Sequence, residues 1–233
     1  MWSRLGTGNA GAGVAALGFA LGGVVVDRGA LAPLTAALDE VGAAGGRASA
    51  LPSLLGLPAW AVVGLGLAGI GLALSRLPAI GPARGHWRWP VTGLALGLVG
   101  VLAWVGGSLS GWRWGLSITG PSRSLAEGLL LAGADLGGWG PAMLLGIPLG
   151  SWLSARLRGP VGWRAPAASE LPRRFLGGLL MGAGGTIAAG CNIGNALTGL
   201  SVLSTQSLVA VVGMVAGTAA AIRALDGEDR RAA

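Results

Sequence analysis

Residues 175–222 read FLGGLLMGAGGTIAAGCNIGNALTGLSVLSTQSLVAVVGMVAGTAAAI, a run of 48 residues without a charged side chain. Two membrane-crossing helices need about 20 residues each to span a hydrocarbon core of about 30 Å. The run is long enough for two crossings, but its purely apolar parts, 175–190 and 208–222, are each too short to finish one. The polar part between them must therefore lie within the membrane, where irregular backbone survives only if it lines protein or a watery cavity. We expect the functional site in this polar segment.

The composition of the whole chain also indicates a membrane protein. Hydrophobic residues make up 52% of the sequence, charged residues 11%, and glycine accounts for 46 of 233 residues. Small residues allow membrane helices to approach closely, and spacings such as Gly178–Gly182 and Gly213–Gly217 fit that use. The net charge of +7 is spread among loops, which argues against nucleic acid as a partner. A single cysteine excludes an intramolecular disulfide and a thiolate-rich metal site, so we expect no metal and no cofactor.

The pattern of charge-free windows predicts an all-α integral membrane protein with about six transmembrane helices and additional short re-entrant or half-helices. We treat residues 1–233 as a single transmembrane transport domain, with internal repeats roughly at 1–110 and 111–233. The expected crossings lie in 5–26, within 48–75, within 89–112, within 136–155, and in the two halves of 175–222.

The distribution of arginine predicts how these helices are oriented. The loop at 76–88 carries three arginines and no acid, and the loop at 156–174 carries five arginines against one acid. Cytoplasmic loops are enriched in Lys and Arg, so both loops are placed in the cytoplasm and the acidic loop at 27–49 outside. Two crossings separate the two basic loops, which is self-consistent. Both termini are then predicted to be cytoplasmic.

Residues 113–135 remain between two predicted crossings and contain an apolar piece too short to span a bilayer. A re-entrant hairpin or an interfacial helix is the natural interpretation. Arg123 and Glu127 stand four residues apart, so they can pair on one helical face. Its part at 113–130 is expected to lie across from 182–204, where the two form a central constriction. It supplies the secondary candidates for a substrate pathway, which are Trp114, Ser117, Arg123 and Glu127.

Several local signals predict that a helix is broken near Cys191. Glycines loosen the preceding span, and Asn192 and Asn195 are favourable types for the first position of a new helix. Hydroxyl residues follow at three- and four-residue spacing from Thr198 to Thr205, so one face of that helix would be hydroxylated. A helix that starts within the membrane directs unpaired N–H groups at an anion. The primary pathway candidates are Gly190, Cys191, Asn192, Gly194, Asn195, Thr198 and Ser201. The simpler alternative for Cys191 is a small packing residue.

The stretch RRFLGGLLMGAGGTIAAGCNIGNALTGLSVLS at 173–204 resembles the signature of the YeeE/YedE family of sulfur-compound transporters. Two weaker similarities lie in GWRWGLSITGPSRSLAEGLLLAG at 111–133 and LGFALGGVVVDRGALAPLTAAL at 17–38. The resemblance implies a multi-pass protein of the bacterial inner membrane that takes up thiosulfate or a related species through an internally repeated helical bundle. Cys191 matches the signature cysteine, and Gly190 and Gly194 match its flanking glycines.

The chain also departs from that family pattern. Asn195 stands where the family usually has histidine, and Ala32 stands near the position of the first repeat's cysteine. Family members are thought to pass substrate between several cysteines, which a chain with one cysteine cannot do. The resemblance therefore implies a different sulfur species, a single thiol used as a filter, or a partner protein that supplies the rest.

These observations favour a transporter or channel for a small sulfur-containing anion of the thiosulfate type, passing a midplane constriction that contains Cys191. The chain has no lysine and hence no P-loop, and it is not expected to be an enzyme. Two alternatives stay open: a membrane-embedded sulfur-relay component that uses Cys191 as acceptor, and a non-transporting scaffold. Expected partners are the lipid bilayer, the anion, and either a cytoplasmic sulfur-carrier protein or a second membrane subunit.

Overall fold

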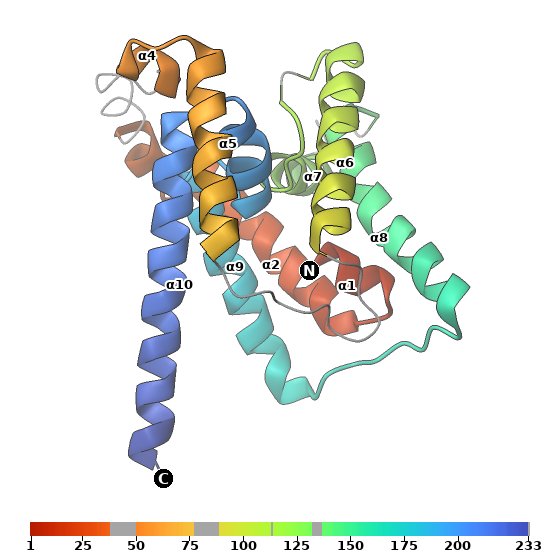
Figure 1. The fold of residues 1–233 in the computed structure, drawn as a ribbon. Helices are drawn as coiled ribbons and strands as arrows, with labels where there is room; N and C mark the ends of the chain where they lie inside the picture. The colour runs from red at the N-terminus through yellow and green to blue at the C-terminus, as the bar shows by residue number, and fades with distance from the viewer. Residues whose placement is uncertain (38–49, 77–88, 113, 132–136, 233) are drawn as a thin grey trace.

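The computed structural model describes residues 1–37, 50–76, 89–112, 114–131 and 137–232, and all regular structure within them is helical (Figure 1). The elements are α1 (Trp2–Gly6), α2 (Ala10–Asp27), α4 (Leu51–Leu55), α5 (Ala59–Arg76), α6 (Trp89–Leu109), α7 (Thr119–Leu131), α8 (Trp139–Arg158), the 3₁₀ turn η1 (Ala168–Glu170), α9 (Leu171–Ile187), the π-helix η2 (Ile193–Gly199) and α10 (Thr205–Ala232).

Four of these helices are long and apolar enough to cross a membrane: α2, α5, α6 from Pro90, and α10 as far as Ala224. The prediction of an all-α membrane protein is therefore confirmed. The remaining two expected crossings correspond to α8, which contains Pro148, and to α9, which ends after 17 residues. Six crossings remain a prediction, and so do the internal repeats.

The centre of the molecule is the crossing of α2 and α9, which pack closely because glycines face each other there. A Cβ on Gly178 would collide with the carbonyl oxygen of Ala15, and one on Gly182 would collide with that of Phe19. Such contact between backbones is the usual role of small residues in membrane helix pairs. The prediction that the Gly178–Gly182 spacing serves close packing is thus confirmed.

The outer helices are packed very differently from α2. Half of the membrane-length window of α2 is buried, against 6% in α5, 11% in α6 and 6% in α10. Their exposed side chains are large and apolar, for example Leu65, Leu94 and Val209, as expected for a surface that faces lipid. Gly213 and Gly217 on α10 have no atom of another described element within 4 Å of the position of a Cβ. Their spacing therefore serves no packing contact in this part of the chain.

The long helices alternate in direction, and this brings particular helix ends together. The last residues of α8, the first residues of α9 and the last residues of α10 all lie at the lower end of the view in Figure 1. The basic loop that joins α8 to α9 is therefore at the same end as the C-terminus, as the orientation prediction requires. The basic loop at 77–88 lies outside the described residues.

Candidate functional site

The backbone stops being α-helical directly before Cys191. Helix α9 ends at Ile187, and Ala189 takes a left-handed conformation with φ of 54°, which is uncommon for a residue other than glycine. The amide of Gly190 then donates to the carbonyl of Gly185 at 2.7 Å. The chain resumes as the π-helix η2, a form that occurs often at functional sites. The predicted helix break near Cys191 is confirmed.

A second break follows soon after, and here the sequence-based expectation was wrong. Residues 202–204 form a turn in which Leu203 has a φ of 54°, and α10 begins at Thr205. The expected single hydroxylated half-helix is thus divided between η2 and α10. Thr198 and Ser201 lie on the first part, while Ser204 and Thr205 lie at the start of the second. The reason is local, because the turn interrupts the helical spacing that related these residues.

Asn195 was expected to begin a helix. Instead, it holds together the broken segment, which is residues 188–204 between α9 and α10. Its side chain is buried and donates to the carbonyls of Ala188 at 3.2 Å and Gly190 at 2.7 Å, while its Oδ1 accepts from Ser207 at 3.0 Å. One amide therefore joins the end of α9, the break and the first turn of α10. Asn192 does precede η2, but its side chain is exposed and forms no capping hydrogen bond.

The two segments that were expected to face each other across a constriction are in contact. The buried hydroxyl of Thr198 on η2 donates to the carbonyl of Leu116 at 2.6 Å, just before α7. A Cβ on Gly194 would stand 3.7 Å from the Oγ of Ser117. Helix α7 is 13 residues long, too short to cross a bilayer, which agrees with the expected short helix in this region.

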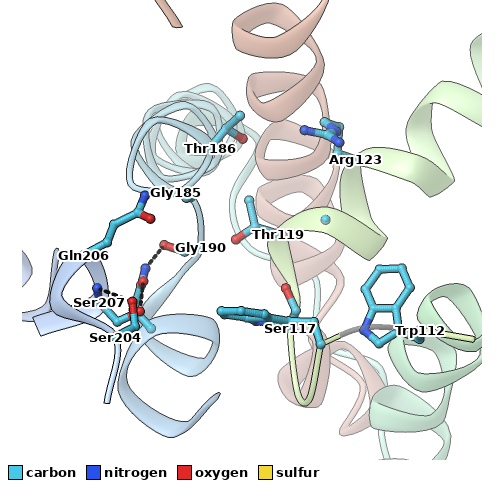
Figure 2. Close-up of a pocket in the computed structure, with 14 residues that line it drawn as sticks. Trp112, Ser117, Thr119, Arg123, Gly185, Thr186, Gly190, Ser204, Gln206 and Ser207 are labelled. Carbon is cyan, nitrogen blue, oxygen red and sulfur yellow. Dashed lines mark hydrogen bonds between the residues drawn. The ribbon is translucent and has the colours of Figure 1, made fainter. Parts of the chain in front are cut away.

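A polar chamber of about 380 Å³ lies where these segments meet (Figure 2). Ser117, Thr119 and Arg123 line it from the α7 side, opposite Gly185, Gly190 and Gln206. The other lining residues are Trp112, Trp114, Gly120, Thr186, Ala189, Asn195, Ser204 and Ser207. Because α7 begins at this chamber, its first amides and the positive end of its dipole lie close to it.

Two hydroxyl groups in the polar chamber are available to a ligand. Thr119 is 6% exposed, and its Oγ1 has no hydrogen-bond partner among the described residues. Ser117 is 8% exposed, and its hydroxyl likewise forms no hydrogen bond within the part of the chain that the structure describes. Buried polar groups without partners are uncommon and call for an explanation. A polar ligand in the chamber would satisfy both.

Arg123 supplies the chamber's positive charge and belongs to a group of four charged residues. It pairs with Asp27 on α2 at 2.9 Å and with Glu127, one turn further along α7, at 3.5 Å. The contact with Glu127 is the predicted pair four residues apart, but it is an ion pair without hydrogen-bond geometry. Glu127 also lies 3.7 Å from Arg28. The two negative and two positive charges of these side chains thus cancel at the edge of the chamber.

A second cavity, of about 570 Å³, lies on the other side of the broken segment. Its lining is mostly apolar and includes Met1, Met143, Met181 and Cys191. We call it the sulfur chamber. Ser117 lines both chambers, so the two approach each other at this residue. The thiol of Cys191 is free and half-buried.

The broken segment therefore forms a wall between the two chambers, because different residues of this segment line each of them. Gly190 and Asn195 line the polar chamber, whereas Cys191, Asn192 and Ile193 line the sulfur chamber. Of the secondary candidates, Trp114, Ser117 and Arg123 line the polar chamber, whereas Glu127 lines neither chamber and pairs with Arg123 and Arg28.

Three of the primary candidates line neither chamber, and several lining residues had not been anticipated. Thr198 and Gly194 form contacts between segments, whereas Ser201 is exposed and donates to the carbonyl of Thr198. Sequence reasoning missed several residues that line the chambers, which are Thr119, Met143, Met181, Thr186, Gln206 and Ser207. Only Gln206 and Ser207 had a sequence signal, because both lie in the polar segment quoted at the outset.

Comparison with known proteins shows the family to which the chain belongs. A family model described as sulphur transport matches residues 1–220. The thiosulfate transporter TsuA of Escherichia coli (strain K12) is 35% identical over 132 residues, which is 57% of this chain and 38% of the relative. The thiosulfate transporter TsuA of Spirochaeta thermophila is 32% identical over 176 residues, 74% of this chain and 52% of the relative. The chain thus spans about half or less of these relatives. With the family model matching nearly its whole length, the chain belongs to the sulphur transport family, the YeeE/YedE family whose signature it resembles.

Proposed function

We propose that this protein is a transporter or channel for a small sulfur-containing anion of the thiosulfate type. The anion passes from one chamber to the other through the gap between Ser117 and Gly194. The path is facilitative or ion-coupled, and the protein acts by conduction and not as an enzyme. The two TsuA relatives are named as thiosulfate transporters, which supports this choice of substrate class.

The observation that carries the proposal is the wall between the two chambers. Within this segment Ala189, Gly190 and Asn195 line the polar chamber, whereas residues 191–193 line the sulfur chamber, and Ser117 lines both. At the closest point the wall is thin, because Gly194 presents no side chain to Ser117. A permeation path needs polar groups on its way but weak binding at each step. Adjacent cavities separated by a glycine and a serine fit that requirement.

The polar chamber suits the oxygen-bearing end of such an anion. Arg123 provides a positive charge, and Thr119 and Ser117 provide hydroxyl donors without other partners among the described residues. Hydrogen bonds from a guanidinium to an oxyanion are roughly twice as strong as neutral ones. Asp27 holds Arg123 from the other side, so the site attracts the anion without binding it too tightly to release.

Cys191 lies on the far side of the gap, where a passing anion would meet the thiol. A thiol is a weak donor, so its contact with the anion's sulfur is reversible. We therefore assign Cys191 the role of a filter that contacts the sulfur and forms no lasting bond. Its place in the sulfur chamber, with Met143 and Met181, supports this role.

We propose the bacterial inner membrane as the location, with both termini in the cytoplasm. Arg156 and Arg158 lie in the last turn of α8, and Arg173 and Arg174 lie in the first turn of α9, at the same end as the C-terminus. Arg76 ends α5. Basic residues of this kind stay on the cytoplasmic side. A second membrane subunit or a cytoplasmic sulfur-carrier protein is the proposed partner, because a chain with one cysteine cannot by itself pass substrate between several.

Uptake of radiolabelled thiosulfate into proteoliposomes tests the proposal. The wild type should take up thiosulfate, and Cys191→Ala should lower the rate. Gly194→Ala adds a methyl group at ordinary contact distance from Ser117, so it should leave the fold intact and slow uptake by narrowing the gap. Gly184→Ala is the matched control, because a Cβ there meets no atom of another described element within 4 Å.

Two results would contradict the proposal. Absence of uptake by the folded wild type would exclude transport of this anion by the chain alone. Equal uptake by Gly194→Ala and Gly184→Ala would place the path elsewhere. Labelling of Cys191 with a membrane-impermeant thiol reagent adds a check, because substrate should protect a filter thiol but leave a packing thiol unaffected.

A further inference from the structure

The lining of the sulfur chamber is unusual in its chemistry. Three of the chain's four methionines and its single cysteine line this one cavity. They come from four separate places in the chain: Met1 precedes α1, Met143 lies on α8, Met181 lies on α9, and Cys191 lies in the break. No helical periodicity relates these four positions. The fold itself gathers the sulfur atoms around one space.

Thioether and thiol groups favour some ligands over others. Their sulfur atoms are soft and polarizable, and they form only weak hydrogen bonds. Most of the other lining residues, such as Leu96, Val99 and Ile147, are apolar, and side chains of this kind offer no compensation for a hydrated oxyanion. Dispersion attraction to a polarizable sulfur atom is the main favourable term that such a lining can supply. The cavity therefore suits a sulfur atom better than a sulfonate-type oxygen.

One buried polar group of the sulfur chamber, Ser117, lies at the edge that it shares with the polar chamber. Ser117 is 8% exposed, lines both cavities, and has no hydrogen bond to any residue the structure describes. The indole nitrogen of Trp2, another lining residue, is buried and likewise unpaired within the described residues. Ser117 can thus donate to the polar end of a ligand at the shared edge, and Trp2 offers a second donor within the sulfur chamber.

We infer that the sulfur chamber is a binding site for the terminal sulfur of the substrate, with Met143 and Met181 as specificity-determining residues. The oxygens of the same anion face Ser117 and the polar chamber. This inference rests on the proposed function and deepens it. It explains how the protein distinguishes thiosulfate from sulfate, two dianions that differ by one sulfur atom in place of one oxygen.

Binding can be measured directly by NMR of the full chain labelled with ¹³C at the methionine methyl groups. The Met143 and Met181 signals, assigned with the single Met→Leu variants, should shift on addition of thiosulfate and stay in place on addition of the same concentration of sulfate. The signal of Met214, on α10 and outside the lining of this cavity, should respond to neither anion. Equal shifts with both anions, or none with thiosulfate, would overturn the inference. If the Met143 and Met181 signals shift only when the alkyl chain of the detergent is changed in length, the cavity is a groove for lipid. That result would overturn the inference too.

Transport gives an independent measurement. The double variant Met143→Leu/Met181→Leu keeps apolar side chains of similar volume and should lower thiosulfate uptake by roughly threefold to tenfold. Met214→Leu is the matched control and should transport at the wild-type rate. Wild-type uptake by a folded double variant would overturn the inference while leaving the proposed function intact. Methionine shifts with a wild type that transports nothing would support the site and contradict the transport function.

Discussion

The same glycine spacing occurs on two helices of this protein, but among the described residues it brings two backbones together on only one of them. On α9, Gly178 and Gly182 press against the backbone of α2, and neither could accept a Cβ without moving that helix. On α10, Gly213 and Gly217 meet no other described element within 4 Å. The small-residue motif therefore does not define a helix contact on its own. The partner helix decides whether the glycines are required.

This difference extends to the layers that contain the two helices. The inner layer of α2, α7, α9 and η2 holds the four charged residues, the buried amide of Asn195 and the unpaired hydroxyls. The outer helices α5, α6 and α10 expose large apolar side chains along most of their length. Substitutions in the inner layer should therefore affect folding and transport, and equivalent ones on the exposed faces of the outer helices should affect neither.

The largest effect is expected from adding one methyl group to the glycine pair on α9, compared with the same change to the pair on α10. Gly182→Ala places a Cβ against the carbonyl of Phe19, so α2 and α9 must separate, at a cost of about 2–3 kcal/mol or more in stability. Gly217→Ala should change stability by no more than about 1 kcal/mol, because only helix propensity changes. Thermal unfolding in detergent compares the two. Similar losses for both variants would show that α10 also packs against a partner.

A smaller effect is expected from removing the amide that joins the broken segment. Asn195→Ala leaves two carbonyls and the hydroxyl of Ser207 without their partners. An unsatisfied buried group costs about 1–3 kcal/mol, so the melting temperature should fall and uptake should decrease. Ser207→Ala removes only one of the three bonds and should cost less. A wild-type melting temperature for Asn195→Ala would mean that the break is held by other contacts.

The smallest effect on stability is expected among the four charged residues around Arg123. Asp27→Asn removes the 2.9 Å partner of Arg123, but both side chains are about one-third exposed, so the loss should be below about 1 kcal/mol. Arg123 would then be freer to hold an anion. Uptake at low thiosulfate concentration should rise by roughly twofold to fivefold and become more sensitive to salt. Asp27→Glu keeps the charge and serves as the control. An unchanged rate with Asp27→Asn would remove Arg123 from substrate recognition.

The parts of this structure that sequence could predict are those set by length and local chemistry. The charge-free run at 175–222 and its polar centre predicted a broken helix, and the break lies at 188–192. The pairing of Arg123 with Glu127 followed from their spacing. These inferences needed only residues that are close together in the chain.

The remaining features depend on contacts between distant residues. The pairing of Asp27 with Arg123 joins α2 to α7, and the chamber that contains Met143, Met181 and Cys191 joins α8, α9 and the break. Nothing local marks Thr119 as a buried hydroxyl without a partner among the described residues. The second turn, at 202–204, was missed because its hydroxyl residues also fit a continuous helix.

The π-helical form of η2 has a consequence for how the segment tolerates change in length. A π-turn accommodates one more residue than an α-turn, and each residue of an α-helix rotates the chain by about 100°. Deleting one residue between Ile193 and Gly199 would let this stretch become an ordinary α-turn. The side chains after the deletion would keep nearly the same direction, because the π-turn takes up its extra residue within the turn itself. A one-residue deletion within η2 should therefore be tolerated better than one within α9, where losing a residue rotates everything after it by about 100°.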